Sequence, residues 1–281
     1  MPAHIYYRLG RWKDSIRVNV DAARADEAYL KASGDKGLYR YGYYPHNVHF
    51  IVASAQMAGD MPTAIREARK LSTILDPKTS SEIGWIQAVN AAPYFAAAQF
   101  ASPGQILAMA PPDRRLPYPT AMRHYARAVA YANQRNRAGF DRELGALQAA
   151  AKSGDFKTMI DQGVPAPNLL QLAETSARAR WAYASGRYAD AVKLYQDAAA
   201  IESKITYMRH RITSFRCVEA KENVSRTRAQ RKTCSDVKFR QSSTTRATSS
   251  HDGTTRVGWP ETLVPIRPRL NAIASSRPSI I

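Results

Sequence analysis

The segment that decides the fold class is Ala182-Tyr183-Ala184-Ser185-Gly186-Arg187-Tyr188-Ala189-Asp190-Ala191-Val192-Lys193-Leu194-Tyr195-Gln196-Asp197-Ala198-Ala199-Ala200-Ile201-Glu202. Gly186 can adopt the left-handed backbone geometry in which helices commonly end, because glycine pays almost no steric penalty there. After it, Ala191, Tyr195 and Ala198 recur at helical spacing and form one apolar face. The alanines allow two helices to approach closely, and the tyrosine fills the remaining gap. The segment therefore predicts a turn followed by an amphipathic helix.

The same spacing recurs earlier in the chain. Small or apolar residues again stand five, nine and twelve positions after a turn residue, and a further, less regular turn is expected at residues 101–104. The matching sets are Ala64, Ala68 and Leu71 after Gly59; Phe140, Leu144 and Leu147 after Arg135; and the more polar Ser15, Asn19 and Ala22 after Gly10. Repetition of one helical pattern indicates a chain of helical hairpins, each of which must bury its apolar face against a neighbour.

A first helix is expected before each turn, with irregular segments between the hairpins. We expect first helices at residues 45–57, 91–100, 121–133 and 169–185, and a short helix at 105–109. Pro77 is expected to end a helix, with a loop or cap at 79–81. The proline-rich segment 111–119 and the segment 153–168 are expected to be loops.

The turn and face residues resemble a tetratricopeptide repeat, which has a turn glycine, an aromatic two residues later, and then alanine, an aromatic and alanine. Gly186, Tyr188, Ala191, Tyr195 and Ala198 hold those places. The segments 4–6, 42–50 and 124–127 are similar to a group of long, mostly bacterial tetratricopeptide-repeat proteins of poorly defined function. The resemblance covers about residues 2–208, but Ala101-Ser102-Pro103 departs from the Gly-Arg-Trp-like turn of such proteins. It implies an all-α, right-handed superhelix of about five hairpins.

The resemblance also suggests that the first hairpin is cut short. Only nine residues precede Gly10, whereas a first helix of this repeat needs about fourteen. We therefore expect the chain to be a fragment, or to start at an internal methionine. The N-terminal residues lack the charged and apolar regions of a secretory signal. Because the start looks cut short, the localisation is unknown, with the cytoplasm as the default. No run of apolar residues is long enough to predict a membrane span.

Charge divides the chain into a repeat domain, 1–203, and a basic tail, 204–281. The chain has a formal net charge of +18, of which residues 1–203 contribute +7 and residues 204–281 contribute +11. Serine, threonine and arginine dominate the tail, so it is expected to be disordered. One alternative is that the tail binds nucleic acid. Another is a frameshifted end, because the resemblance predicts further hairpins after Glu202, and codons can be chosen whose neighbouring frame encodes a Pro/Tyr-rich segment.

The resemblance implies a peptide-binding groove. In such arrays the first helices line the concave face, at positions thirteen, ten, six and three before the turn. A groove with these side chains would suit an extended peptide with polar or acidic groups, although all of them could equally be ordinary surface and packing residues. The candidates are His46, His49, Gln56, Tyr125, Ser176, Arg180 and Tyr183. A non-catalytic scaffold for a protein or peptide ligand is therefore the favoured function.

A metal-dependent enzyme is a further alternative, since His46 and His49 can share one helix face. A third ligand would have to come from another hairpin, and His4 and His124 are the candidates. Both cysteines lie in the tail and form neither a zinc pattern nor a disulfide framework. The glycines and serines match no phosphate loop, dinucleotide fingerprint or nucleophile elbow, so no cofactor is expected. Arginines between residues 114 and 142 add positive charge that an acidic partner or plain solvation would explain.

Overall fold

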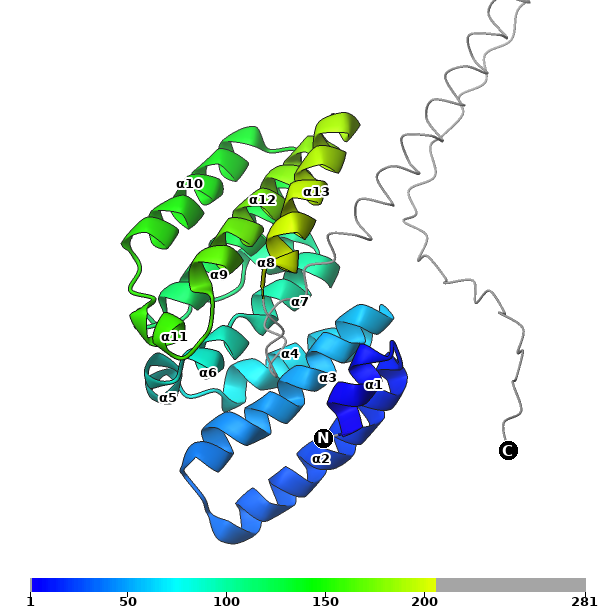
Figure 1. Ribbon diagram of the computed structural model, residues 1–281, viewed down its shortest axis with the longest axis vertical. Helices are drawn as coiled ribbons and strands as arrows, with labels where there is room; N and C mark the ends of the chain where they lie inside the picture. The colour runs from blue at the N-terminus through cyan, green and yellow to red at the C-terminus, as the bar shows by residue number, and fades with distance from the viewer. Residues whose placement is uncertain (1, 206–281) are drawn as a thin grey trace, which may run out of the picture. The chain divides into compact units, whose positions relative to one another are not determined.

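The computed structural model of the chain describes residues 2–205, which all belong to one compact unit. Helices form all of the regular secondary structure in these residues, so the all-α prediction is confirmed (Figure 1). The expectations about the tail, from disorder to nucleic-acid binding, concern residues 206–281 and lie outside the described residues. Lys204 and Ile205, at the start of that tail, follow the last described helix directly.

Five pairs of consecutive helices account for most of the described chain. The pairs are α1 (Pro2–Arg8) with α2 (Trp12–Ser33), α3 (Tyr44–Ala58) with α4 (Met61–Ile74), α7 (Ala92–Phe100) with α8 (Pro103–Leu107), α9 (Pro117–Asn133) with α10 (Arg137–Ser153), and α12 (Ala166–Ala184) with α13 (Tyr188–Ser203). Between the pairs lie the π-helix η1 (Tyr39–Tyr43) and the short helices α5 (Pro77–Glu82), α6 (Gly84–Val89) and α11 (Lys157–Asp161).

Four of the five predicted turns contain a residue in the left-handed region. Gly10, Gly59 and Gly186 have φ of 73°, 73° and 77°, and Arg135 has φ of 55° without being glycine. Each of these residues ends one helix shortly before the next begins. The turn at 101–104 differs, because Ala101 is extended and Ser102 caps α8 with its side chain. The irregular third hairpin expected from the sequence is therefore confirmed.

The residues predicted to lie on the inner faces of the second helices are almost all buried. They pack each second helix against its partner, as in the last hairpin, where Ala191 and Tyr195 lie against Ala179 and Ala182. Ala22 is partly buried, and the fully buried members are Ser15, Asn19, Ala64, Ala68, Leu71, Phe140, Leu144, Leu147, Ala191, Tyr195 and Ala198. The spacing of five, nine and twelve residues thus describes the core correctly.

Two of the proline-based loop predictions are wrong. Residues 79–81 lie inside α5, which starts at Pro77 and is capped by the Asp76 carboxylate accepting from the Thr79 amide. The predicted loop 111–119 ends earlier than expected, because α9 already begins at Pro117. Proline lacks an amide hydrogen but is well suited to the first turn of a helix, where that hydrogen has no partner in any case. Here proline starts helices as well as ending them.

The predicted loop 153–168 is also wrong in part, since it contains α11 and the first turn of α12. The short helix α6 was not predicted. Helices α6 and α11 are both short and pack against each other. Polar contacts connect them: the Gly84 amide donates to the Gln162 side chain at 2.8 Å, and Gln162 donates to the Glu82 carbonyl at 3.1 Å. Such contacts are tertiary, so helical periodicity cannot reveal them.

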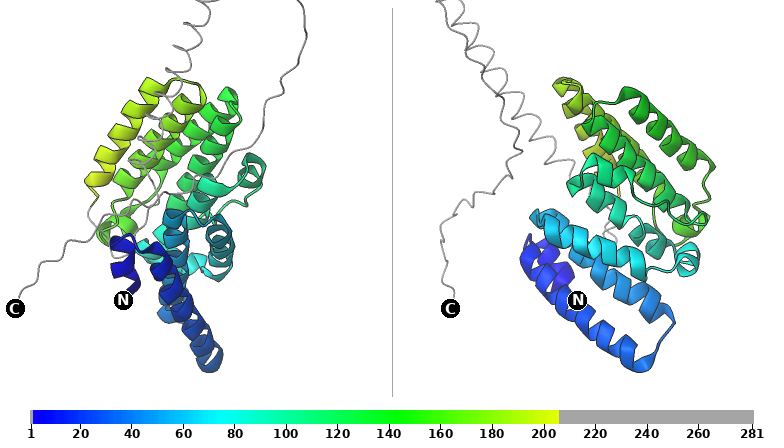
Figure 2. Two further views of the ribbon diagram at one scale, coloured as in Figure 1. Left: turned by 90° about the vertical axis from the view of Figure 1, so that its right-hand side faces the viewer. Right: turned by 180° about the vertical axis from the view of Figure 1, so that it is seen from behind.

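Neighbouring hairpins pack in chain order. Helix α4 contacts α7, α7 contacts α9, and α9 contacts α12, while each first helix also contacts its own partner. Figure 2 shows the α2–α3 pair at one end of this series and the α12–α13 pair at the other. Helices α4 and α7 form most of the boundary between the second and third hairpins, whereas the third and fourth hairpins also meet through α8 and α9.

Replacing Gly84 by alanine is expected to lower the free energy of unfolding by about 1–3 kcal/mol, because a rigid backbone would have to move. A Cβ at this position would lie 2.7 Å from the Met159 Cα and 3.0 Å from the Thr158 carbonyl oxygen. Gly145→Ala is the matched control: it lies inside α10 with nothing within 4 Å, and alanine there should stabilise the fold by about 0.5–1 kcal/mol. Urea denaturation measures both, and equal values would contradict the packing of α6 on α11.

Candidate functional site

The residues predicted to line a concave groove are mostly buried. His46, His49 and Gln56 on α3, Tyr125 on α9 and Ser176 on α12 are each less than a tenth exposed. Arg180 is half-buried, and Tyr183 is 38% exposed with its ring 5.5 Å from that of Tyr188. Their burial means that most of these side chains are already packed within the chain, so whether they form a peptide groove stays a prediction.

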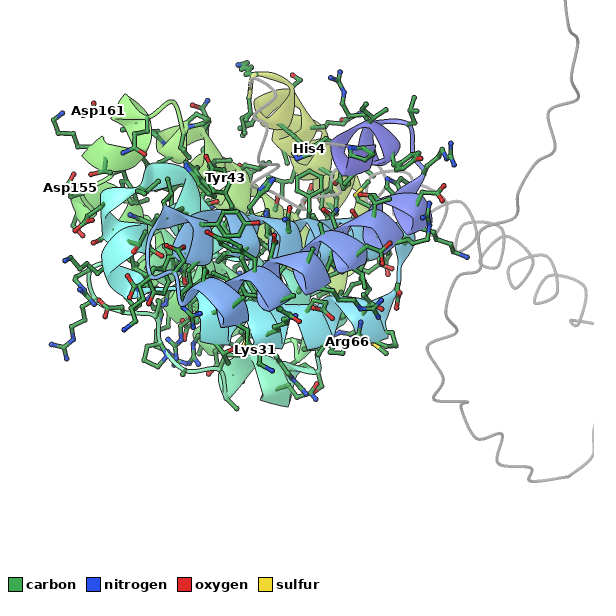
Figure 3. All side chains as sticks on the ribbon, turned by 90° about the horizontal axis from the view of Figure 1, so that it is seen from below. His4, Lys31, Tyr43, Arg66, Asp155 and Asp161 are labelled. Atoms are coloured by element: carbon green, nitrogen blue, oxygen red, sulfur yellow. The ribbon has the colours of Figure 1, made fainter. Side chains whose placement is uncertain are left out.

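His46 belongs to an aromatic cluster between α1 and α3. Its Nε2 lies 3.3 Å from the His4 Nε2, and the two rings stack with centroids 5.3 Å apart. Phe50 lies 4.0 Å from the His4 ring and 5.3 Å from the His46 ring, and Trp85 meets His46 edge-on. The His4 side chain thus comes from another hairpin to His46, as the metal-site alternative requires. Figure 3 labels His4 on its short helix.

Gln56 and Tyr125 connect neighbouring hairpins. The Gln56 side-chain amide donates to Gln99 Oε1 at 2.9 Å, and Gln99 donates back to the Gln56 carbonyl at 3.1 Å. This reciprocal pair fixes α3 against α7. The Tyr125 ring lies 6.1 Å from the Phe95 ring, which joins α9 to α7. These two residues therefore have a packing role in addition to any contact with a ligand.

The residues within 2–205 contain no cluster of three or more His, Cys, Asp and Glu side chains that could hold a metal ion. His124, the other proposed ligand, instead places its Nδ1 2.9 Å from Glu143 Oε2. None of the helices described is both long and apolar enough to cross a bilayer.

Glu143 on α10 is the centre of a buried polar cluster. Its carboxylate accepts from Arg127 Nε at 3.0 Å as well as contacting His124, and Arg127 also donates to the Leu107 carbonyl at 3.0 Å. Burial alone would raise the pKa of Glu143, but the hydrogen bonds and charges of His124 and Arg127 outweigh it and lower that pKa. Part of the positive charge between residues 114 and 142 is therefore used internally, to fasten α8 and α10 to α9.

An open cleft of about 750 Å³ lies where α4, α7 and α8 meet. Its walls are mostly apolar. From α4 come Met61 and Ile65, and from α7 come Ala97 and Phe100. Met109, just after α8, closes one side, and its carbonyl accepts from the Arg123 guanidinium at 3.3 Å, which holds this wall against α9. Clefts of this volume with apolar walls are typical of ligand sites.

Two arginines of α4, Arg66 and Arg69, stand at the rim of this cleft, and no acidic residue is among the described side chains that line it. Arg66 Nε contacts Glu67 Oε1 at 2.8 Å and is 62% exposed. Arg69 is exposed and has no ion-pair partner within residues 2–205. Figure 3 shows Arg66 well separated from His4, so the cleft is distinct from the aromatic cluster at α1.

The cleft was not predicted from the sequence, although the chain contains one signal for it. The prolines at 103, 111 and 112 leave room for only a short second helix in the third hairpin. A short helix leaves part of its neighbours uncovered, which could have indicated an opening beside α8.

Comparison with known proteins gives no relative: no protein family, no curated protein and no solved structure matches this chain. The residues and their geometry therefore carry the functional argument alone.

Proposed function

We propose that the chain is a non-catalytic binding scaffold, built from divergent tetratricopeptide-like hairpins, that holds a segment of another protein. The apolar cleft between α4, α7 and α8 is the observation that carries this proposal, because it is open and its walls come from three packed helices. The left-handed turns and the buried positions after them support the repeat-like part of the proposal. The cleft replaces the predicted concave groove as the preferred site, since most groove residues are buried.

Fluorescence anisotropy of the full chain with a labelled peptide tests this function. The probe is a neutral peptide of about 14 residues, long enough for about 20 Å of helix, with leucine on one face and glutamine on the other. We expect saturable binding that Ile65→Glu weakens about tenfold or more, because a carboxylate in the apolar wall would lose its hydration without gaining a partner. Lys193→Glu, an exposed change on α13, is the control for added negative charge and should leave binding unchanged.

Circular dichroism must show that both variants keep the helix content and melting temperature of the wild type. Saturable binding that survives Ile65→Glu would place the peptide elsewhere and remove the support for this function.

A further inference from the structure

The third hairpin has an unusually short second helix. Helix α8 has 5 residues, whereas the second helices α4, α10 and α13 have 14, 17 and 16. Its start is fixed by Ser102 and Gln105, which form a capping box, and Pro111 and Pro112 follow soon after its end. A second helix as long as those of the other hairpins is therefore absent beside α4 and α7.

Helices α4 and α7 each present a row of side chains to the cleft. On α4 the row is Met61, Ile65, Ala68 and Ser72, and on α7 it is Pro93, Ala97 and Phe100. Both rows have the spacing of three or four residues that brings side chains onto one helix face. The α4 row extends over about 16 Å, or three helical turns. Two such rows side by side form a groove into which the ridge of a third helix can pack.

The charged side chains that line the cleft indicate which kind of helix would fit it. The described lining contains two arginines and no acidic side chain. Arg66 contacts the neighbouring Glu67, whereas Arg69 has no ion-pair partner within residues 2–205. Both arginines project from the same side of α4, three positions apart, which is one helical turn. A helix lying along the groove would therefore meet apolar walls on its inner face and positive charge along one edge. Acidic residues on that edge would complement it.

We propose that this cleft binds an acidic amphipathic helix of a partner protein, which lies beside the short α8 where the other hairpins have a long second helix. The inference rests on the proposed function, since it names the occupant of the same cleft. The partner helix would place apolar residues at spacings of three and four against Ile65, Ala97 and Phe100. Its carboxylates would lie near Arg66 and Arg69.

Three labelled peptides test the proposal on the full chain, together with the neutral probe. They share the leucine face and differ elsewhere: one has glutamate on its flanks, one has lysine, and one has glutamate with a central proline that breaks the helix. We expect the glutamate peptide to bind about tenfold more tightly than the lysine peptide, and the proline to weaken binding about tenfold or more. Arg69→Glu should reverse the charge preference, and Lys193→Glu should leave it unchanged.

The outcomes separate this inference from the proposed function. Equal binding of the glutamate and lysine peptides, or of the proline-containing peptide and its parent, overturns the acidic helix. The proposed function still holds in that case if Ile65→Glu removes the binding. Absence of any peptide binding overturns both. Sedimentation velocity tests an alternative occupant, a second copy of this chain. Dimers that form with rising protein concentration and are lost in Ile65→Glu would assign the cleft to that second copy and overturn the partner helix.

Discussion

Replacing Trp181 by alanine is expected to lower the free energy of unfolding by about 3–5 kcal/mol, the range for truncating a large aromatic in a packed core. Trp181 is buried on α12, and its ring stacks on Phe140 of α10 with centroids 4.8 Å apart and 25° between planes. The Arg137 guanidinium lies 5.4 Å from the same ring. The indole therefore joins the last two hairpins through one stacked contact and one cation–π contact, and alanine would leave a cavity that both helices border.

Two further variants test whether this loss of stability comes from the buried indole ring. Trp181→Phe keeps an aromatic face against Phe140 and should cost only about 1–2 kcal/mol. Tyr183→Ala, two residues later on α12 but 38% exposed, should cost below about 1 kcal/mol. Urea denaturation followed by far-ultraviolet circular dichroism measures the free energy of unfolding of all three variants. An unchanged slope of this free energy against urea concentration indicates an unchanged denatured state. Similar losses for Trp181→Ala and Tyr183→Ala would contradict the packing described.

The long hairpins could be predicted from the sequence because their signals are local. A turn residue able to adopt positive φ, followed by small or apolar residues five, nine and twelve places later, is visible in the chain without knowledge of its partners. Even Arg135, which is not glycine, was located by the spacing of Phe140, Leu144 and Leu147. Regular periodicity over several turns thus outweighs one unusual turn residue.

The candidate site could not be predicted in the same way. The concave positions were assigned from the geometry of regular repeats, but His46 and Gln56 pack on His4 and Gln99, which belong to other hairpins. The cleft arises from something absent, the long second helix of the third hairpin, and depends on how α4 and α7 meet across it. Residues that recur at a fixed spacing are visible in the sequence, whereas a surface that a short helix leaves open depends on how its neighbours pack.

Glu143→Gln is the second substitution for which we expect a large effect: it should lower the free energy of unfolding by roughly 3 kcal/mol at neutral pH. Removing the charge of a buried carboxylate leaves Arg127 and His124 without their anion, and breaking a buried pair commonly costs this much. The side chain of Glu143 is 6% exposed, and those of His124 and Arg127 are 23% and 17% exposed. Because both partners can regain some hydration, we expect the lower part of the range for buried pairs.

The pH dependence of this loss follows from the direction of the pKa shift. The pKa of Glu143 is lowered in the folded chain below its ordinary value of 4.5: burial opposes this shift, and the hydrogen bonds from His124 and Arg127 cause it. A carboxyl with a lowered folded pKa stabilises the fold above its unfolded pKa and loses this contribution as the pH falls through the folded value. Unfolding curves at a series of pH values should therefore show the difference between wild type and Glu143→Gln shrinking below about pH 4.5.

Glu174→Gln is the control for this experiment, because Glu174 pairs with Arg178 at the partly exposed surface of α12, and the Oε1 that accepts from Gln148 is kept in glutamine. An exposed pair of this kind contributes about 0–1 kcal/mol, so its loss should be small at every pH. A difference for Glu143→Gln that stays constant down to low pH would mean that its carboxylate is not what holds α9 to α10. In that case the amide of glutamine, rather than the missing charge, would be disturbing the packing around Leu144 and Leu147.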